Sequence, residues 1–77
     1  MIITHLQQLY SDHALREAVV EPSRESNGWQ DEFTDSNGER LTLTDSTGAV
    51  RLCSSLDEAT EMAQQVGFTR IRVEEQF

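Results

Sequence analysis

The chain has 77 residues, a formal net charge of −8 and a single cysteine. This length predicts one domain, residues 1–77, with room for one sheet and one or two helices but little room for a deep pocket. Fourteen acidic residues against six Arg and no Lys argue against general attraction to nucleic acid or to anionic membranes, and no apolar run is long enough to span a bilayer.

The first half of the chain predicts a helix followed by two strands. Apolar residues at helical spacing predict a short amphipathic helix over Ile3–His13. A strand is predicted over Leu15–Glu21, and it ends where Pro22 cannot donate a ladder hydrogen bond. A second strand is predicted over Trp29–Thr34, and the polar segment between the strands, residues 22–28, is predicted to be a flexible loop.

One turn motif occurs twice, ten residues apart. Thr34–Gly38 reads TDSNG and Thr44–Gly48 reads TDSTG. In each copy the Asp and Ser side chains can bond nearby backbone amides, and the Gly accepts the positive φ that hairpin loops require. The alternating segments that follow, Arg40–Thr44 and Ala49–Cys53, are therefore predicted to be the third and fourth strands of a β-meander.

The last third of the chain predicts a capped helix and a final strand. Ser55 and Glu58 have the spacing of a capping box, in which each side chain accepts a hydrogen bond from the backbone amide of the other residue. An apolar stripe follows at helical spacing, and Gly67 stands where the C-terminal cap of a helix belongs. Thr69–Glu75 alternates apolar and charged residues and predicts the fifth strand.

The resulting order α-β-β-β-β-α-β predicts an α+β fold. The sheet is expected to have five strands and to be mostly antiparallel, with the last strand antiparallel to the first and able to pair beside it. Because the strands alternate apolar and polar residues, both helices are expected on the same face. The core is then predicted to contain these side chains: Leu6, Leu9, Val20, Trp29, Phe33, Leu41, Leu43, Val50, Leu52, Leu56, Met62, Val66, Ile71 and Val73.

Three arginines form a candidate binding patch. If Leu52 and Ile71 point toward the helices, strand alternation directs their neighbours to the open face of the sheet. These neighbours are Arg51, Arg70 and Arg72, half of the arginines in an acidic chain. Guanidinium groups bind carboxylate and phosphate through paired hydrogen bonds, so the patch is a candidate site for an anion or a partner protein. The alternative is ordinary cross-strand pairing with acidic residues predicted on the same face: Glu17, Glu21, Glu32 and Glu74.

No set of residues in the sequence predicts catalysis, so the chain is predicted not to be an enzyme. Cys53 has no His or helix N-terminus placed against it, and because it is the only cysteine it favours a reducing, cytoplasmic setting. His5 and His13 flank the first helix without further ligands at metal-binding spacing, so no metal or cofactor is predicted. Trp29 is predicted to lie in the core, and the alternative is an exposed anchor at an interface.

A set of turn, cap and core residues covers most of the chain after the first helix and forms a pattern shared with other proteins. The set comprises Glu21-Pro22, Gly28-Trp29, Phe33-Thr34-Asp35, Leu41-Thr42-Leu43-Thr44-Asp45, Gly48, Arg51, Ser55-Leu56-Asp57-Glu58-Ala59 and Gly67-Phe68. It resembles small uncharacterised accessory proteins of bacterial plasmids and integrative elements, some of them partition-associated. The resemblance implies a bacterial, cytoplasmic accessory protein of a mobile element without known catalysis, and it carries no functional residue across.

These observations favour a small non-catalytic interaction module that binds another protein through the open sheet face or an edge strand. A second hypothesis is a nucleic-acid accessory factor in which Arg51, Arg70 and Arg72 contact phosphates. Related to it is an acidic decoy that occupies a nucleic-acid-binding protein, and a small enzyme ranks last. Both a monomer and a homodimer are compatible with the sequence.

Overall fold

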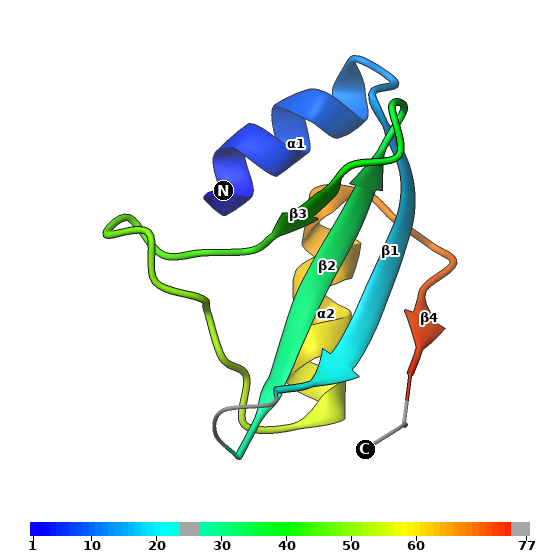
Figure 1. The fold of residues 1–77 in the computed structure, drawn as a ribbon. Coiled ribbons are helices and arrows are strands. Elements are labelled where there is room, and N and C mark those ends of the chain that lie inside the picture. Colours follow the sequence, from blue (N-terminus) through cyan, green and yellow to red (C-terminus); the bar gives the residue numbers. More distant parts are fainter. Residues whose placement is uncertain (24–26, 75–77) are drawn as a thin grey trace.

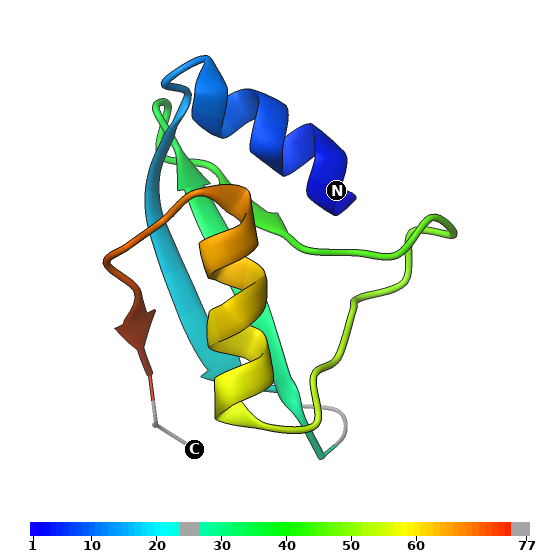
Figure 2. The ribbon, with the colours of Figure 1, turned by 180° about the vertical axis from the view of Figure 1, so that it is seen from behind.

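The structure is a mixed β-sheet with two helices packed against one of its faces (Figures 1 and 2). It is a computed structural model that describes residues 1–23 and 27–74. The elements are α1 (Ile3–Ser11), β1 (Leu15–Pro22), β2 (Trp29–Asp35), β3 (Arg40–Thr42), α2 (Leu56–Val66) and β4 (Arg72–Val73). Within the described residues the sheet has four strands in the order β3-β2-β1-β4, in which β2 is antiparallel to both neighbours and β4 is parallel to β1.

The sheet differs from the predicted one. The predicted number of five strands and the predicted mostly antiparallel arrangement are both wrong. The predicted fourth strand, Ala49–Cys53, makes only isolated bridges. After Leu43 the chain leaves the sheet, turns back through a hairpin, and rejoins the edge of β2 where Cys53 pairs antiparallel with Trp29. The returning residues therefore continue along β2 in the direction of β3. Since the predicted reversal between the third and fourth strands is missing, α2 returns the chain with β4 parallel to β1. The last strand does lie beside the first, as predicted.

We call residues Leu43–Cys53 the arm, and Figure 1 shows it projecting from the β3 side of the sheet. Its tip repeats the turn that joins β2 to β3. In both copies the Oδ1 atom of the Asp, Asp35 or Asp45, accepts hydrogen bonds from the backbone amides two and four residues further on, at 2.8–3.2 Å. The glycines, Gly38 and Gly48, adopt φ angles of 86° and 91°. The predicted repetition of one turn is therefore confirmed.

Helix α2 has both predicted caps, with one change of partner. Ser55 Oγ accepts a hydrogen bond from the amide of Glu58 at 3.1 Å. The Glu58 carboxylate accepts from the hydroxyl of Ser54 at 2.8 Å and not from the Ser55 amide. At the other end Gly67 has a φ of 138°, and a Cβ atom there would lie 2.5 Å from the ring of Tyr10. This close approach packs the end of α2 directly against α1.

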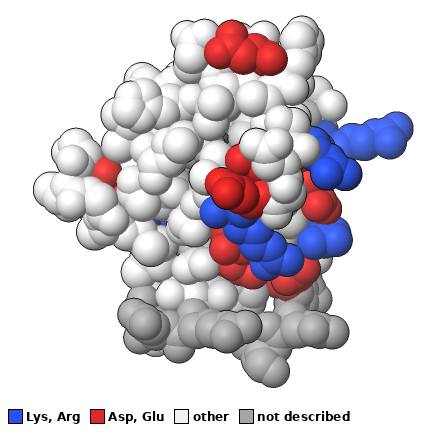
Figure 3. All heavy atoms as spheres, turned by 45° about the horizontal axis from the view of Figure 1, so that its top comes forward, with Lys and Arg blue, Asp and Glu red and all other residues white. Residues whose placement is uncertain are grey.

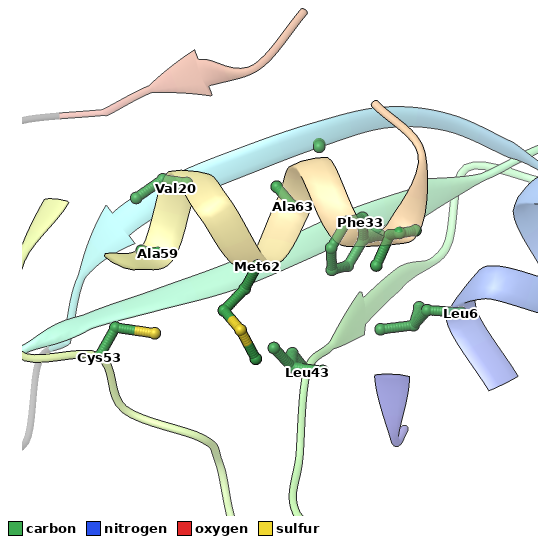
Figure 4. Close-up of a cluster of buried hydrophobic side chains, with 10 residues drawn as sticks. Leu6, Val20, Phe33, Leu43, Cys53, Ala59, Met62 and Ala63 are labelled. Atoms are coloured by element: carbon green, nitrogen blue, oxygen red, sulfur yellow. The ribbon is translucent and has the colours of Figure 1, made fainter. Parts of the chain in front are cut away.

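The core lies between the helices and one face of the sheet (Figure 4). Its buried residues are Leu6, Ala18, Val20, Phe33, Leu43, Cys53, Ala59, Met62, Ala63 and Val66. Around them pack the partly buried side chains of Ile3, Leu15, Trp29, Leu41, Leu56, Phe68 and Ile71. Figure 4 shows Met62 reaching from α2 toward Leu43, so the helix also covers the root of the arm.

Three residues predicted in the core are exposed instead. Val50, Leu52 and Val73 have relative exposures of 45%, 43% and 39%. Leu52 faces solvent because the arm rejoins β2 with Cys53 inward, which shifts the register by one residue from the predicted one. Trp29 is partly buried and packs against the core, as the favoured prediction requires.

Two predictions lie partly outside the described residues. The flexible loop predicted at 22–28 includes residues 24–26, and the predicted last strand extends to Glu75. Among the residues that are described, no helix combines the length and the apolar character needed to cross a membrane.

Candidate functional site

The structure separates the three arginines that the sequence places in one patch. Arg70 and Arg72 lie at the β4 edge of the sheet, whereas Arg51 lies on the arm, next to the opposite edge (Figure 1). By strand alternation Arg51 shares a side with the buried Cys53. Its positive charge acts on the nearby Asp31. Arg51 therefore does not join the other two, because the arm rejoins the sheet in the shifted register.

Arg72 is occupied by acidic neighbours. Its Nε atom lies 3.3 Å from Glu17 Oε1, and its Nη2 atom lies 3.1 Å from Glu74 Oε1. Arg40 on the same face lies 3.4 Å from Glu32. The alternative of ordinary pairing therefore describes Arg72, and only Arg70 of the three predicted residues remains as a candidate at this edge.

Arg70 converges with an arginine that the sequence argument did not single out. Arg16 and Arg70 together line a shallow hollow of about 380 Å³. We call it the arginine hollow, and it is lined by Tyr10, His13, Leu15, Arg16, Phe68, Thr69 and Arg70. A second hollow of about 320 Å³ adjoins it along β1, and Arg16 and Arg70 line it together with Glu17 and Arg72.

The fold opens the arginine hollow by separating two chain segments. Among residues 1–23 and 27–74, β4 pairs with β1 at Val19 and Val20 alone, so the connection from α2 is not paired with the first half of β1. β1 itself has an irregular register between Leu15 and Glu17. Both features leave a gap beside the start of β1, where Arg16 and the connection face each other.

Aromatic packing supports one wall of the hollow. The ring of Phe68 meets that of Tyr10 edge to face, with centroids 4.9 Å apart. On its other side Phe68 packs against the buried Phe33, with centroids 5.8 Å apart. This wall of the hollow is therefore packed against the hydrophobic core, which holds the aromatic side chains of the wall in place.

The arginine hollow contains two arginines that form no ion pair in the described part of the chain. Within residues 1–23 and 27–74, neither Arg16 nor Arg70 forms an ion pair. Figure 3 shows basic side chains grouped toward one side of the molecule, with acidic side chains among them. Two exposed guanidinium groups beside aromatic rings can bind a carboxylate or phosphate and pack its apolar neighbours.

A second unusual group lies in the core and not on the surface. Asp31 has a relative exposure of 0%, and neither carboxyl oxygen has a hydrogen-bond partner among the described residues. Burial raises the pKa of the Asp31 carboxyl to about 7, and the charge of Arg51 opposes that rise. The sequence carried this signal, since Trp29, Asp31 and Phe33 alternate along one strand and must share a face.

The single thiol is not activated. Cys53 is 1% exposed, and burial raises the pKa of its thiol, as do the negative charges of Asp31 and Glu58. A thiolate is thus disfavoured at neutral pH, which makes Cys53 a packing residue and a poor nucleophile. Among the described residues, no three His, Cys, Asp or Glu side chains gather closely enough to hold a metal ion.

Comparison with protein families, with curated proteins and with solved structures found no match for this chain.

Proposed function

We propose that the protein is a non-catalytic interaction module that binds a short acidic segment of another protein in the arginine hollow. The observation that carries the proposal is the convergence of Arg16 and Arg70 without an ion pair among the described residues, in a chain of net charge −8. A surface with so many carboxylates could neutralise both groups, as it does for Arg72. Two open guanidinium groups beside aromatic rings suit a carboxylate with an apolar neighbour.

The charge of the chain favours an acidic protein segment over nucleic acid. Duplex DNA carries one negative charge per ~1.7 Å of its axis, so a bound duplex would bring many phosphates against a surface of net charge −8. A short peptide segment brings only a few carboxylates, and these can all lie in the hollow without contacting the acidic remainder of the surface. An accessory role in nucleic-acid binding remains the second candidate, because the same two guanidinium groups can also take a phosphate.

The cellular setting is part of the proposal. We infer a bacterial cytoplasm and a mobile genetic element as the source. The support is the single buried Cys53, which pairs with no other cysteine, and the resemblance described from the sequence.

Titration monitored by amide chemical shifts tests the proposed function. The probes are a short Glu-rich peptide containing one Phe and, separately, a short DNA duplex, both at low salt. We expect the peptide to shift the signals around Arg16 and Arg70, and the double substitution R16Q/R70Q to weaken its binding by about tenfold or more. The matched control is Arg40→Gln, which removes a guanidinium that already pairs with Glu32.

The same titration can refute the proposal. Equal peptide binding by the double variant and the parent would exclude the arginine hollow. Stronger binding of duplex than of peptide would favour the nucleic-acid alternative.

A further inference from the structure

Asp31 lies at the point where the arm leaves the sheet. The backbone N–H of Leu43 donates to the carbonyl of Asp31 at 3.0 Å, and the carbonyl of Leu43 accepts from the backbone N–H of Arg51 at 3.0 Å. Two residues along β2, Trp29 and Cys53 exchange backbone hydrogen bonds of 2.9 and 2.8 Å. The arm is thus attached to β2 at Asp31 itself and at Trp29, two residues before it.

The surroundings of the Asp31 carboxyl favour its neutral form. It is fully buried on β2 and stands opposite Val20 of β1, which belongs to the same core cluster as Met62 and Ala59 of α2. The charged group that acts on it is Arg51 of the arm, which makes no hydrogen bond with it in the described structure. The other titratable neighbour is the Cys53 thiol of the arm, whose pKa is raised by burial and by the charge of Asp31. A charge in such a position is unfavourable unless water or a cation reaches it.

Release of the arm from β2 would leave the main part of the sheet in place. The β1–β2 ladder runs from Leu15 to Pro22, and α2 packs on both strands, so neither depends on the arm hydrogen bonds. The arm, in contrast, joins the edge of β2 after β3 through the Leu43 amide and the Trp29–Cys53 pair. Besides these bonds, two hydrogen bonds with Met1 hold Thr44 of the arm. A small number of bonds therefore attaches the arm at this edge, and local opening is expected where few bonds must break.

We propose that the arm is a protonation-controlled flap, closed on β2 while Asp31 is neutral and released from β2 when Asp31 is ionised. Release hydrates the carboxylate and lets Arg51 turn toward it. This inference goes beyond the proposed function and does not depend on it, because the arm lies away from the arginine hollow.

Amide hydrogen exchange followed by NMR on the full chain tests the proposal. Protection factors remove the intrinsic pH dependence of exchange. We expect protection of the Cys53 and Leu43 amides to fall about tenfold or more from about pH 5.5 to about pH 8, the factor expected for a buried carboxyl that titrates near neutrality. The Val19 amide, in the β1–β2 ladder, is the internal control and should keep its protection.

Two variants separate the flap from other causes. In Asp31→Asn the fall in protection should disappear. In Arg51→Gln, which changes an exposed side chain, the fall should move to higher pH because the opposing positive charge is lost. An unchanged midpoint in Arg51→Gln, the same fall in Asp31→Asn, or an equal fall at Val19 would each overturn the proposal.

Discussion

Replacing Asp31 with Asn should stabilise the protein at neutral pH. The folded-state pKa of about 7 lies above the ordinary value of 3.8, so the folded protein holds this proton more tightly than the unfolded chain. The neutral carboxyl makes its full contribution to the free energy of unfolding below the pKa that Asp31 has in the unfolded chain. That contribution is lost as the pH rises toward and through the pKa that Asp31 has in the folded protein. Asn has nearly the same shape and does not ionise, so the variant escapes this loss.

The magnitude follows from the same two pKa values. They differ by about three units, and each unit corresponds to about 1.4 kcal/mol, which sets an upper limit of about 4 kcal/mol. Entry of water and relaxation of the arm reduce the cost of ionisation, so we expect a gain of about 2–4 kcal/mol at pH 8. Small domains have a total stability of about 5–15 kcal/mol, so this change is easily measured.

Urea unfolding followed by the fluorescence of Trp29 measures the difference. The parent, Asp31→Asn and the control Asp12→Asn, which alters an exposed carboxylate, are compared at several values from about pH 5 to about pH 8. The gain in Asp31→Asn should grow with pH, while the control should stay within about 0.5 kcal/mol of the parent. A gain that does not change with pH would refute the argument, because it would come from packing and not from ionisation.

Three further predictions concern the caps and the arm. Gly67→Ala should lower the free energy of unfolding by about 2 kcal/mol or more, because the new Cβ meets Tyr10 and φ is positive, and Tyr10→Ala should cost less in the Gly67→Ala background than in the parent. Ser55→Ala should cost about 1 kcal/mol in thermal or urea unfolding, since it removes the acceptor for the Glu58 amide. Hydrogen bonds from Thr47 lower the pKa of Asp45, so these bonds are fully formed above the pKa of Asp45 in the unfolded chain and weaken as the pH falls through its pKa in the folded protein. The amide chemical shifts of the turn should report this change with pH, and Asp45→Ala should abolish it.

Local signals predicted the local elements well. The Ser55 cap, the Gly67 end of α2 and the two copies of the turn were all visible in the sequence, because each depends on residues only a few positions apart. The placement of both helices on one face followed from the alternation of the strands.

The number and direction of the strands depend on whether each hairpin joins the sheet, and the local sequence does not show this. Both copies of the turn make a hairpin, but only the first continues as a strand of the sheet, while the second folds outward as the arm. The rejoining register buried Cys53 and exposed Leu52, and it moved Arg51 away from the other arginines. The prediction assumed that every hairpin adds a strand, so it placed one reversal too many before α2.

The arginine hollow was missed because it joins segments distant in sequence. Arg16 lies on β1 and Arg70 follows α2, and only the separation of β4 from the first half of β1 brings them to one hollow. Asp31 is a different case, since its position between Trp29 and Phe33 on one strand face was sufficient to place it in the core.

The path of the arm also suggests how this chain could tolerate editing. Leu43 stands opposite Asp31 on β2 and Cys53 stands opposite Trp29, so two residue steps on β2 are spanned by ten on the other side. A chain that lacks residues 44–51 would join Leu43 to Leu52 and Cys53 with the spacing of an uninterrupted edge strand. The arm is therefore an insertion between adjacent positions of one sheet edge, and we expect residues 44–51 to tolerate exchange or deletion without a change in the rest of the sheet.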